Sequence, residues 1–496
     1  MGLIENIPFL SIMLCMVSGI ISSALHGKKV KYFCYGIITI VGILSLILFL
    51  DLRVSEEIIV YKMGNFSAPW GNEIRASMLE AGMAIIFCMI MLFSVVGGRL
   101  FMEREVVESK HNLYYVLINL LLSSLLALIY TNDLFTAYVF VEINTISACG
   151  LIMIRQTGKT IEAATRYMIM SLLGSGLLLI GISILYDCTG HLLISNIQVE
   201  IAKLSQSGEY MLPIVIATAL MSVGIAIKSA LYPFHSWLPD AYGYSSVGAA
   251  SILSSLVSKG YIFLLIKIFY RVIGIEMVNG GKIIDILFVF GLVGMIMGSI
   301  SAMHENDIRR MIAFSSVAQI GYIYMGIGLG TKIGMVASLF HIITHGITKA
   351  LLFISVAGLT DAAGTSRRFI DLTGAAYRNK VAGVAFTVGS LSMVGIPMLS
   401  GFISKLLFSQ AAIENDGKML PTLIVLAIST IFNAIYFLKT VIRIYTPVAS
   451  NFETKKFSQQ KAYAIALIAF SILNVVIGML SQPIVDSISK GLDLFS

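Results

Sequence analysis

The stretch SLFHIITHGITKALLF, residues 338–353, is apolar along most of its length, yet it carries His341, His345 and Lys349. Steps of four residues nearly complete one helical turn, so these three side chains lie on one stripe of one helix. A charged group at the centre of a membrane helix costs about 2.5–3.5 kcal/mol. Three ionisable groups on one apolar helix therefore indicate a function.

The stripe has more than one chemical interpretation. Imidazole, with an unperturbed pKa near 6.5, accepts and releases protons at physiological pH, and burial lowers the pKa of a lysine until it can do the same. Two histidines four residues apart could instead bind a metal, but the flanking residues supply neither a third ligand nor a carboxylate. Either histidine alone could be an ordinary core residue. We favour a proton path and expect no metal site.

The composition indicates a membrane protein. The chain has 496 residues, of which 57% are hydrophobic and 12% charged, whereas soluble chains have about 25% charged residues. The net charge of +7 fits basic cytoplasmic loops and does not indicate a nucleic-acid partner. The five cysteines are scattered without a CxxC pair, so we expect no cofactor: neither an iron–sulfur centre, zinc nor a disulfide framework. A catalytic membrane oxidoreductase is excluded because ligands for haem, flavin or clusters are missing.

The apolar runs predict an all-α polytopic membrane protein with about 14 spans, since a helix needs about 20 apolar residues to cross a bilayer. The first run follows Glu5 and precedes lysines, so it is a retained span and no signal peptide. The predicted spans lie near 4–25, 32–50, 77–101, 112–130, 133–154, 163–186, 211–232, 246–270, 283–303, 311–330, 334–358, 382–410, 420–445 and 462–488.

The loops predict the orientation. Loops that follow odd-numbered spans hold roughly twice as many Lys and Arg residues as the others, which places them in the cytoplasm. Both termini are then extracytoplasmic, and the chain is expected in a cell membrane.

Several charged residues stand deep inside predicted spans. A lysine near a helix end can extend its amine to the headgroups without further meaning, and we interpret Lys267, Lys439 and Arg443 in this way. Apolar residues continue for two turns or more around the others, so we treat them as functional. These others are Glu142, Lys228, Lys259 and Lys405.

Two of these lysines stand beside helix breakers. Pro233 follows Lys228, and Pro397 and Gly401 precede Lys405. Broken membrane helices occur where freed backbone lines a wet cavity or is buried in protein, and they recur in transporters with inverted repeats. The order of parts predicts N-terminal helices in 1–110, a first repeat in 111–272, a second repeat in 283–446 and a C-terminal helix in 447–496.

Four motifs resemble one known family. They are KSALYPFHSWLPDAY (228–242), DIRRMIAFSSVAQIGY (307–322), HIITHGITKALLF (341–353) and GIPMLSGFISKLL (395–407). They resemble, in the family's order, the antiporter-like subunits of respiratory complex I, of Mrp-type sodium/proton antiporters and of membrane-bound energy-converting hydrogenases. The resemblance covers about residues 110–445; the run YGYSSVGAA after the first motif departs from it.

The resemblance implies a role for each matching residue. Glu142 and Lys228 resemble the family's paired glutamate and lysine, Lys259 a relay lysine, the 341–349 stripe the central relay, and Lys405 the terminal ionisable group. His235 and Asp240 match the first break motif, and Asp307 and Arg310 match the polar loop before the tenth helix. Thr344 and Thr348 could hold water between these groups, since hydroxyls both donate and accept.

We therefore expect an ion-translocating subunit of a multi-subunit membrane complex, which moves protons alone or in exchange for sodium, with other membrane subunits as partners. The alternative is a self-contained transporter of a small solute. Aromatic and polar side chains at the first break, Tyr232, His235, Trp237 and Tyr242, could line its pocket.

Overall fold

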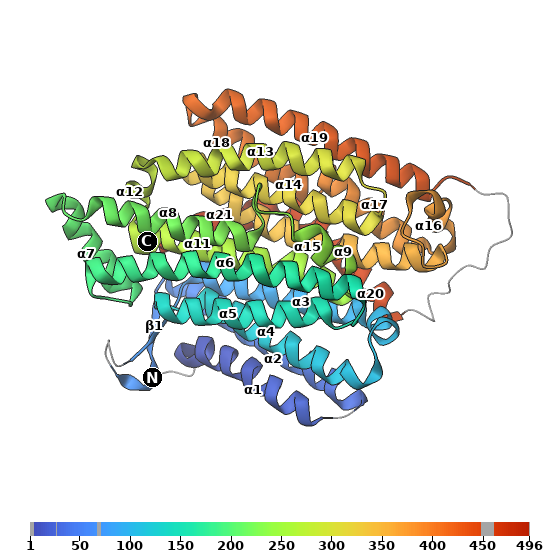
Figure 1. The fold of residues 1–496 in the computed structure, drawn as a ribbon, viewed down its shortest axis with the longest axis horizontal. Coiled ribbons are helices and arrows are strands. Elements are labelled where there is room, and N and C mark those ends of the chain that lie inside the picture. Colours follow the sequence, from blue (N-terminus) through green and yellow to red (C-terminus); the bar gives the residue numbers. More distant parts are fainter. Residues whose placement is uncertain (1–3, 26, 67–70, 448–460, 496) are drawn as a thin grey trace.

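The protein is described by a computed structural model that covers residues 4–25, 27–66, 71–447 and 461–495. Helices run side by side along its long axis (Figure 1). The first half contains α1 (Ile7–Ala24), α2 (Lys28–Ser55), α3 (Met78–Glu105), α4 (His111–Tyr130), α5 (Leu134–Met153), α6 (Gly158–Thr189), α7 (Ile194–Ser207), α8 (Met211–Ser229), α9 (Leu238–Tyr244), α10 (Val247–Ile252) and α11 (Ser258–Lys267). The second half contains α12 (Ile275–Gly280), α13 (Lys282–His304), α14 (Ile308–Gly328), α15 (Lys332–Ala362), α16 (Ala375–Arg378), α17 (Lys380–Val394), α18 (Ser400–Ile413), α19 (Asp416–Ile444), α20 (Lys461–Met479) and α21 (Ser481–Asp493).

The all-α membrane architecture is confirmed. Within the described residues, 13 helices are long and apolar enough to cross a membrane. The predicted span 382–410 accounts for the difference from 14, because it is divided into α17 and α18. The predicted single C-terminal helix is wrong, because two helices lie there: α20 ends at Met479, and α21 follows from Ser481. The polar and apolar residues of α21 lie on different faces, which is typical of a helix at a membrane surface.

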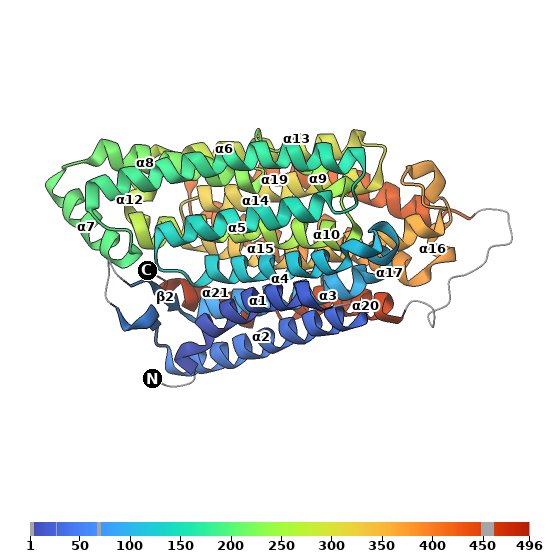
Figure 2. The same ribbon diagram turned by 60° about the horizontal axis from the view of Figure 1, so that its bottom comes forward.

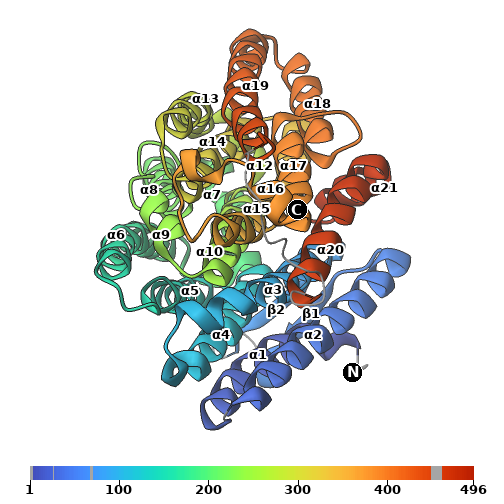
Figure 3. The ribbon, with the colours of Figure 1, turned by 90° about the vertical axis from the view of Figure 1, so that its right-hand side faces the viewer.

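The most enclosed helices are those that carry the central ionisable groups. The most apolar stretches of Val247–Ile273 and of α15 are 100% buried, whereas that of α2 is 28% buried. Figure 3, which looks along the bundle, shows α15 near the middle, α1 and α2 at one edge, and α18 and α19 at another. Ionisable side chains in a membrane helix are costly when they face lipid, and α15, which carries His341, His345 and Lys349, is enclosed by protein.

The two polar stretches between spans form small elements at one end of the bundle. Residues 51–76 include the antiparallel hairpin of β1 (Ile59–Lys62) and β2 (Glu73–Ala76), with Ile59 opposite Ala76. Residues 187–210 include α7. The hairpin and both ends of the described chain lie at this same end (Figure 2).

The first helix break lies between α8 and α9. Helix α8 ends at Ser229, and Ala230 takes a left-handed conformation with φ 62°. Pro233 follows within the break, where its missing N–H leaves no helical bond unmade.

The second break lies between α17 and α18. Gly395 has φ 92°, which a residue with a side chain rarely adopts, and Pro397 lies in the loop that follows. Gly401 is the second residue of α18, and not part of the break itself. A Cβ atom there would collide with the Ser392 carbonyl, so this glycine permits the close approach of α17 and α18.

Two π-helical segments interrupt the eighth span, Leu253–Val257 before Lys259 and Ile268–Ile273 after Lys267. The sequence did not predict them. Such widened turns are rare and occur often at functional sites, because they redirect side chains and free backbone carbonyls.

Candidate ion-translocation site

The central stripe of α15 forms a stack of aromatic rings. The His341 and His345 rings are parallel within 6°, with centroids 5.6 Å apart, and Tyr322 of α14 stacks on His341 at 5.6 Å. Both histidines are buried. All four of their ring nitrogens lack a hydrogen-bond partner among the described residues.

These four nitrogens need partners that the described residues do not supply. Buried polar atoms almost always have a partner, in the protein or in ordered water. In the described part of the chain, no group of three or more His, Cys, Asp or Glu side chains could hold a metal ion. Parallel rings at this distance also cannot bond to each other directly, so any transfer between them needs a bridging molecule.

Lys349 lies one turn beyond His345 and is 0% exposed. Its Nζ donates to the Ile312 carbonyl at 2.8 Å and to the Ser315 hydroxyl, both on α14. These partners are neutral, so they accept a hydrogen bond without fixing the charge of the amine.

Lys405 binds to backbone that the second break exposes. Its Nζ donates to the carbonyl of Val394, the last residue of α17, at 2.6 Å, and to Thr430 Oγ1 at 2.9 Å. Breaking the span therefore supplies a carbonyl oxygen that a continuous helix would have used in its own backbone bonds.

Lys259 likewise donates to a backbone carbonyl, which belongs to a π segment. It is 1% exposed, and its Nζ donates to the carbonyl of Ser254 within Leu253–Val257. Lys259, Lys349 and Lys405 all lie near enough to His341 to act on it electrostatically. The fold thus gathers three lysines and two histidines, and the amines of the lysines donate to carbonyls and hydroxyls.

Glu142 and Lys228 are neighbours without a direct ion pair. Lys228 is 1% exposed and donates to Thr145 Oγ1 at 2.8 Å, one turn from Glu142 on α5. Glu142 is close enough to act on Lys228 electrostatically, yet its Oε1 is buried with no partner among the described residues. Tyr261 of α11 lies beside Lys228, with its ring centroid 5.3 Å from Nζ.

The two threonines of α15 connect the stripe with the second break. Thr344 Oγ1 lies 3.0 Å from Ser404 Oγ, and Thr348 Oγ1 donates to Asn474 Oδ1 at 2.8 Å. Asn474 of α20 also accepts from Ser392 and Ser400, each at 3.0 Å. Asn474 was not predicted from the sequence, although an amide inside an apolar span was a visible signal.

The remaining predicted residues form a separate network. Asp240 pairs with Arg310 and, at 2.9 Å, with Arg166. Asp307 caps α14, because its Oδ1 accepts from the backbone N–H of Arg309 at 2.8 Å and of Arg310 at 3.2 Å. His235 stacks on Tyr232 at 5.1 Å within the first break.

A second buried charged cluster was not predicted from the sequence. Glu80 and Arg271 form an ion pair at 2.7 Å, with both side chains 0% exposed. Arg271 Nε also donates to the Phe495 carbonyl at 2.7 Å. The spacing Ser77-x-x-Glu80 before an apolar run is a capping-box pattern, and the structure contains that box.

Our interpretation of Lys267 as a snorkelling lysine is wrong. Lys267 is 0% exposed. Its Nζ donates to the carbonyls of Leu128 at 3.1 Å, Ile129, and Thr131 at 3.0 Å, at the end of α4. A lysine that satisfies the last carbonyls of a neighbouring helix stabilises that helix end.

The comparison with known families agrees with this architecture. Residues 131–432 match the family described as "NADH:quinone oxidoreductase/Mrp antiporter, TM". The chain belongs to this family. The matched range begins before α5 and ends within α19, so it contains both helix breaks and the whole central stripe.

Relatives within the family come from different assemblies. The chain is 29% identical over 444 residues to "NADH-quinone oxidoreductase subunit N" of Desulforudis audaxviator, covering 86% of each chain. It is 25% identical over 459 residues to a Na(+)/H(+) antiporter subunit of Alkalihalophilus pseudofirmus, covering 90% of this chain and 88% of that one.

The fold is shared with solved respiratory and antiporter complexes. A chain in the Mrp complex from Dietzia sp. superposes with a TM-score of 0.88 at 22% identity, covering 100% of this chain and 98% of that one. A chain of the archaeal membrane-bound sulfane sulfur reductase superposes with a TM-score of 0.87 at 23% identity, covering 99% and 97%.

Proposed function

We propose that this family member is an ion-translocating subunit of a multi-subunit membrane complex and that protons pass along its buried lysines and histidines. The observation that carries the proposal is the His341–His345 stack, whose four ring nitrogens have no partner among the described residues. The buried Lys259 and Lys349 and the partly buried Lys405 lie near it. Lys259 would feed the stack from the first half, and Lys405 would receive protons in the second.

The lysines would work as a coupled set. Buried like charges disfavour one another, and groups that interact strongly release protons as a set and not singly. A proton added at Lys259 therefore weakens the hold on protons elsewhere in the set. Neutral carbonyl and hydroxyl partners let each amine lose its proton without abandoning a counter-ion.

Glu142 and Lys228 would act as a gate. Thr145 now accepts the hydrogen bond from Lys228, while Glu142 Oε1 remains unpartnered among the described residues. Because Glu142 lies close enough to act on Lys228 electrostatically, we propose that the two also pair directly in another state. Opposite charges within about 4–6 Å stabilise each other's charged forms, so forming or opening the pair would change how readily Lys228 passes its proton on.

The relatives' names support partners outside the chain. One relative is a subunit of an NADH-quinone oxidoreductase and another a subunit of a sodium/proton antiporter. We infer that other membrane subunits supply the driving force, and that the cargo is protons, alone or exchanged for sodium. The residues that we assign to the path require no cofactor for this step.

We also propose the arrangement in the membrane. The excess of Lys and Arg in the loops after odd-numbered spans favours a cytoplasmic position for them, with both termini extracytoplasmic in a cell membrane. Two inverted repeats, 111–272 and 283–446, would each contribute one broken span, α8–α9 and α17–α18.

Two of the four side chains that could line a solute pocket at the first break have partners within the protein. Trp237 is buried and donates to the Ile227 carbonyl at 3.2 Å, and the buried Tyr242 hydroxyl bonds Ser258 at 3.0 Å. Side chains that already have these partners are not available for a solute.

The deciding experiment compares two substitutions of Lys349 in the assembled complex, reconstituted in proteoliposomes. Lys349→Ala should stop proton transfer because it removes the amine. Lys349→Arg should also stop it, because a guanidinium does not release its proton. Lys380→Arg, at an exposed position, is the matched control and should transport normally. Near-normal transport by Lys349→Arg would show that Lys349 is only a fixed charge and would refute the path through α15.

A further inference from the structure

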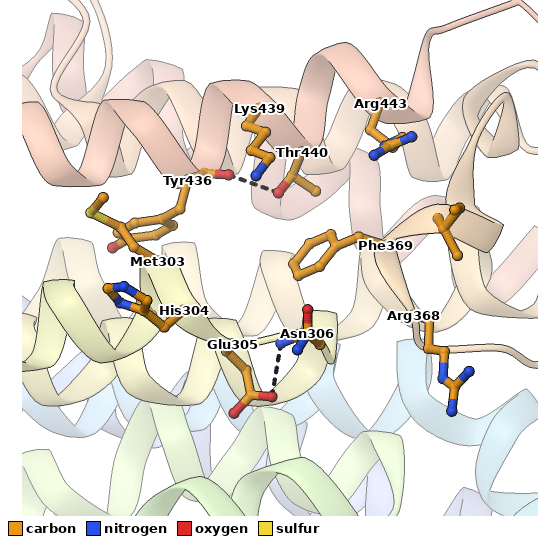
Figure 4. A pocket seen from close by; sticks show the side chains of 12 residues that line it. Met303, His304, Glu305, Asn306, Arg368, Phe369, Tyr436, Lys439, Thr440 and Arg443 are labelled. Carbon is orange, nitrogen blue, oxygen red and sulfur yellow. Dashed lines mark hydrogen bonds between the residues drawn. The ribbon is translucent and has the colours of Figure 1, made fainter.

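An open pocket of about 540 Å³ lies at the end of the bundle where α13 and α19 finish. In Figure 4, α19 passes above the pocket with Tyr436 and Lys439 pointing down, and Met303, His304 and Glu305 form the opposite wall. Phe369 lies between the two sides. None of the residues that line the pocket is assigned to the proton path.

The pocket has an excess of positive charge. Lys439 and Arg443 lie four residues apart on α19, and Arg368 lines the pocket from the segment before Phe369. None of these three side chains has an ion-pair or hydrogen-bond partner in the described part of the chain. Cations without partners at one hollow favour an anionic ligand.

Glu305, the acidic residue of the pocket wall, does not cancel this charge. Its Oε2 accepts from Arg310 Nε at 3.0 Å, and its Oε1 accepts from the backbone N–H of Asn306 at 3.0 Å and of Asp307 at 3.3 Å. Both carboxylate oxygens therefore already have partners, and Arg310, which does not line the pocket, balances the charge of Glu305.

The surroundings of the pocket indicate what kind of anion it takes. Ile435, Leu438 and Ile442 of α19 are 46%, 37% and 68% exposed, and their spacing places them on one stripe of the helix. This apolar stripe ends beside Lys439 and Arg443, in the last two turns of a membrane-spanning helix. Cations at that depth lie at the level of lipid headgroups.

We propose that this pocket binds the phosphate of an acidic phospholipid, with the acyl chains along the Ile435–Leu438–Ile442 stripe. Arg443 and Lys439 contact the phosphate from α19, Arg368 contacts it from the opposite side, and Phe369 packs against the glycerol. Basic pockets between membrane helices are a recognised form of headgroup site. The proposal does not depend on which ion the chain moves.

The test measures lipid binding to the full chain in its assembled complex by native mass spectrometry from nanodiscs. The probes are dioleoyl phosphatidylglycerol, the zwitterionic dioleoyl phosphatidylcholine and inorganic phosphate. The wild type should retain phosphatidylglycerol in preference to phosphatidylcholine. Inorganic phosphate should displace it poorly, because it lacks the tails that pack on the stripe.

Lys439→Gln combined with Arg443→Gln should weaken phosphatidylglycerol binding roughly thirty-fold, since each surface cation contributes about a factor of five. The matched control is Lys28→Gln with Lys29→Gln, which removes two exposed lysines outside the pocket and should bind like the wild type. Lys439→Arg with Arg443→Lys keeps the charges and should retain the lipid.

Three results would overturn the proposal. The first is equal retention of the two lipids by the wild type, which needs no variant. The second is the same loss of binding in the control pair. The third is inorganic phosphate binding as tightly as phosphatidylglycerol, which would mean a site for free anions in which the apolar stripe has no role.

Discussion

Two regions of this molecule with ionisable side chains inside the bundle differ in the partners that those side chains have. In the central relay, the amines of Lys259, Lys349 and Lys405 donate to carbonyls and hydroxyls. In the cluster at the start of α3, Glu80 and Arg271 form a direct ion pair at 2.7 Å. Both regions are enclosed within the bundle, so burial alone does not distinguish them.

The partners decide whether a charge is fixed or movable. A buried ion pair holds both members charged, because neutralising one leaves the other uncompensated. Carbonyl and hydroxyl partners impose no such requirement, so a lysine there can lose its proton. We therefore expect a structural role for the Glu80–Arg271 pair and propose a transport role for Lys259, Lys349 and Lys405.

The largest expected effect is on transport. Lys259→Met should lower proton translocation by at least about 100-fold, the usual contribution of a positioned proton-transfer group. The thermal midpoint of the assembled complex should change little, because the lost bond to one carbonyl, that of Ser254, is offset by the removal of a buried amine. Proteoliposome transport and thermal unfolding are measured on the same preparation. A large fall in the midpoint would place Lys259 with the structural charges.

Next in size is the loss of the ion pair. Glu80→Gln leaves Arg271 buried and unpaired, which should destabilise the complex by about 3–5 kcal/mol. Adding Arg271→Met removes the orphaned charge and should restore most of the stability. The thermal midpoints of the single and double variants decide the matter. If the double variant assembles well but does not transport, Glu80 carries protons, and the contrast between the regions fails.

A smaller effect is expected at Lys267, which lies on the same span as Lys259 and also donates to carbonyls. Unlike Lys259, it lies close enough to the carboxylate of Glu80 for that charge to favour the protonated amine. Lys267→Met should destabilise by about 1–3 kcal/mol, because the carbonyls at the end of α4 lose their donor. Transport per assembled complex should remain near normal. A transport defect as deep as that of Lys259→Met would extend the relay to Lys267.

The smallest effect is expected at Thr348. Thr348→Val removes one hydrogen bond to Asn474, worth about 1 kcal/mol net, while Ser392 and Ser400 still donate to that amide. Transport should fall only modestly, and the midpoint slightly. Complete loss of transport at an unchanged midpoint would instead assign Thr348 to the water path itself.

Much of this site could be predicted because charge in an apolar span is a strong local signal. The stripe at 341, 345 and 349 follows from helical spacing, and both breaks follow from proline and glycine beside a lysine. The roles assigned to these residues stay predictions until the transport measurements are made. The positions of the spans required nothing beyond length and hydropathy.

The failures share one physical cause, which is that sequence distance does not reveal burial or partners. Lys267 was assigned to the headgroups because it stands near a span end, yet α4 and Glu80 enclose it. The hydrogen bonds of Asn474 to Thr348 and Ser400 form only because the fold packs α20 against α15 and the second break. The π segments depend on packing around the eighth span, which has no local signature.

The sequence alone therefore determined the membrane class, the number of spans to within one, and which side chains are costly to bury. It could do so because the free energy of transfer into lipid depends on each residue and its near neighbours. Tertiary packing alone decided which buried charges received a carboxylate and which received only carbonyls and hydroxyls. This difference in partners separates Arg271 from Lys349. A carboxylate partner favours the charged form, whereas carbonyl and hydroxyl partners allow the side chain to release its proton.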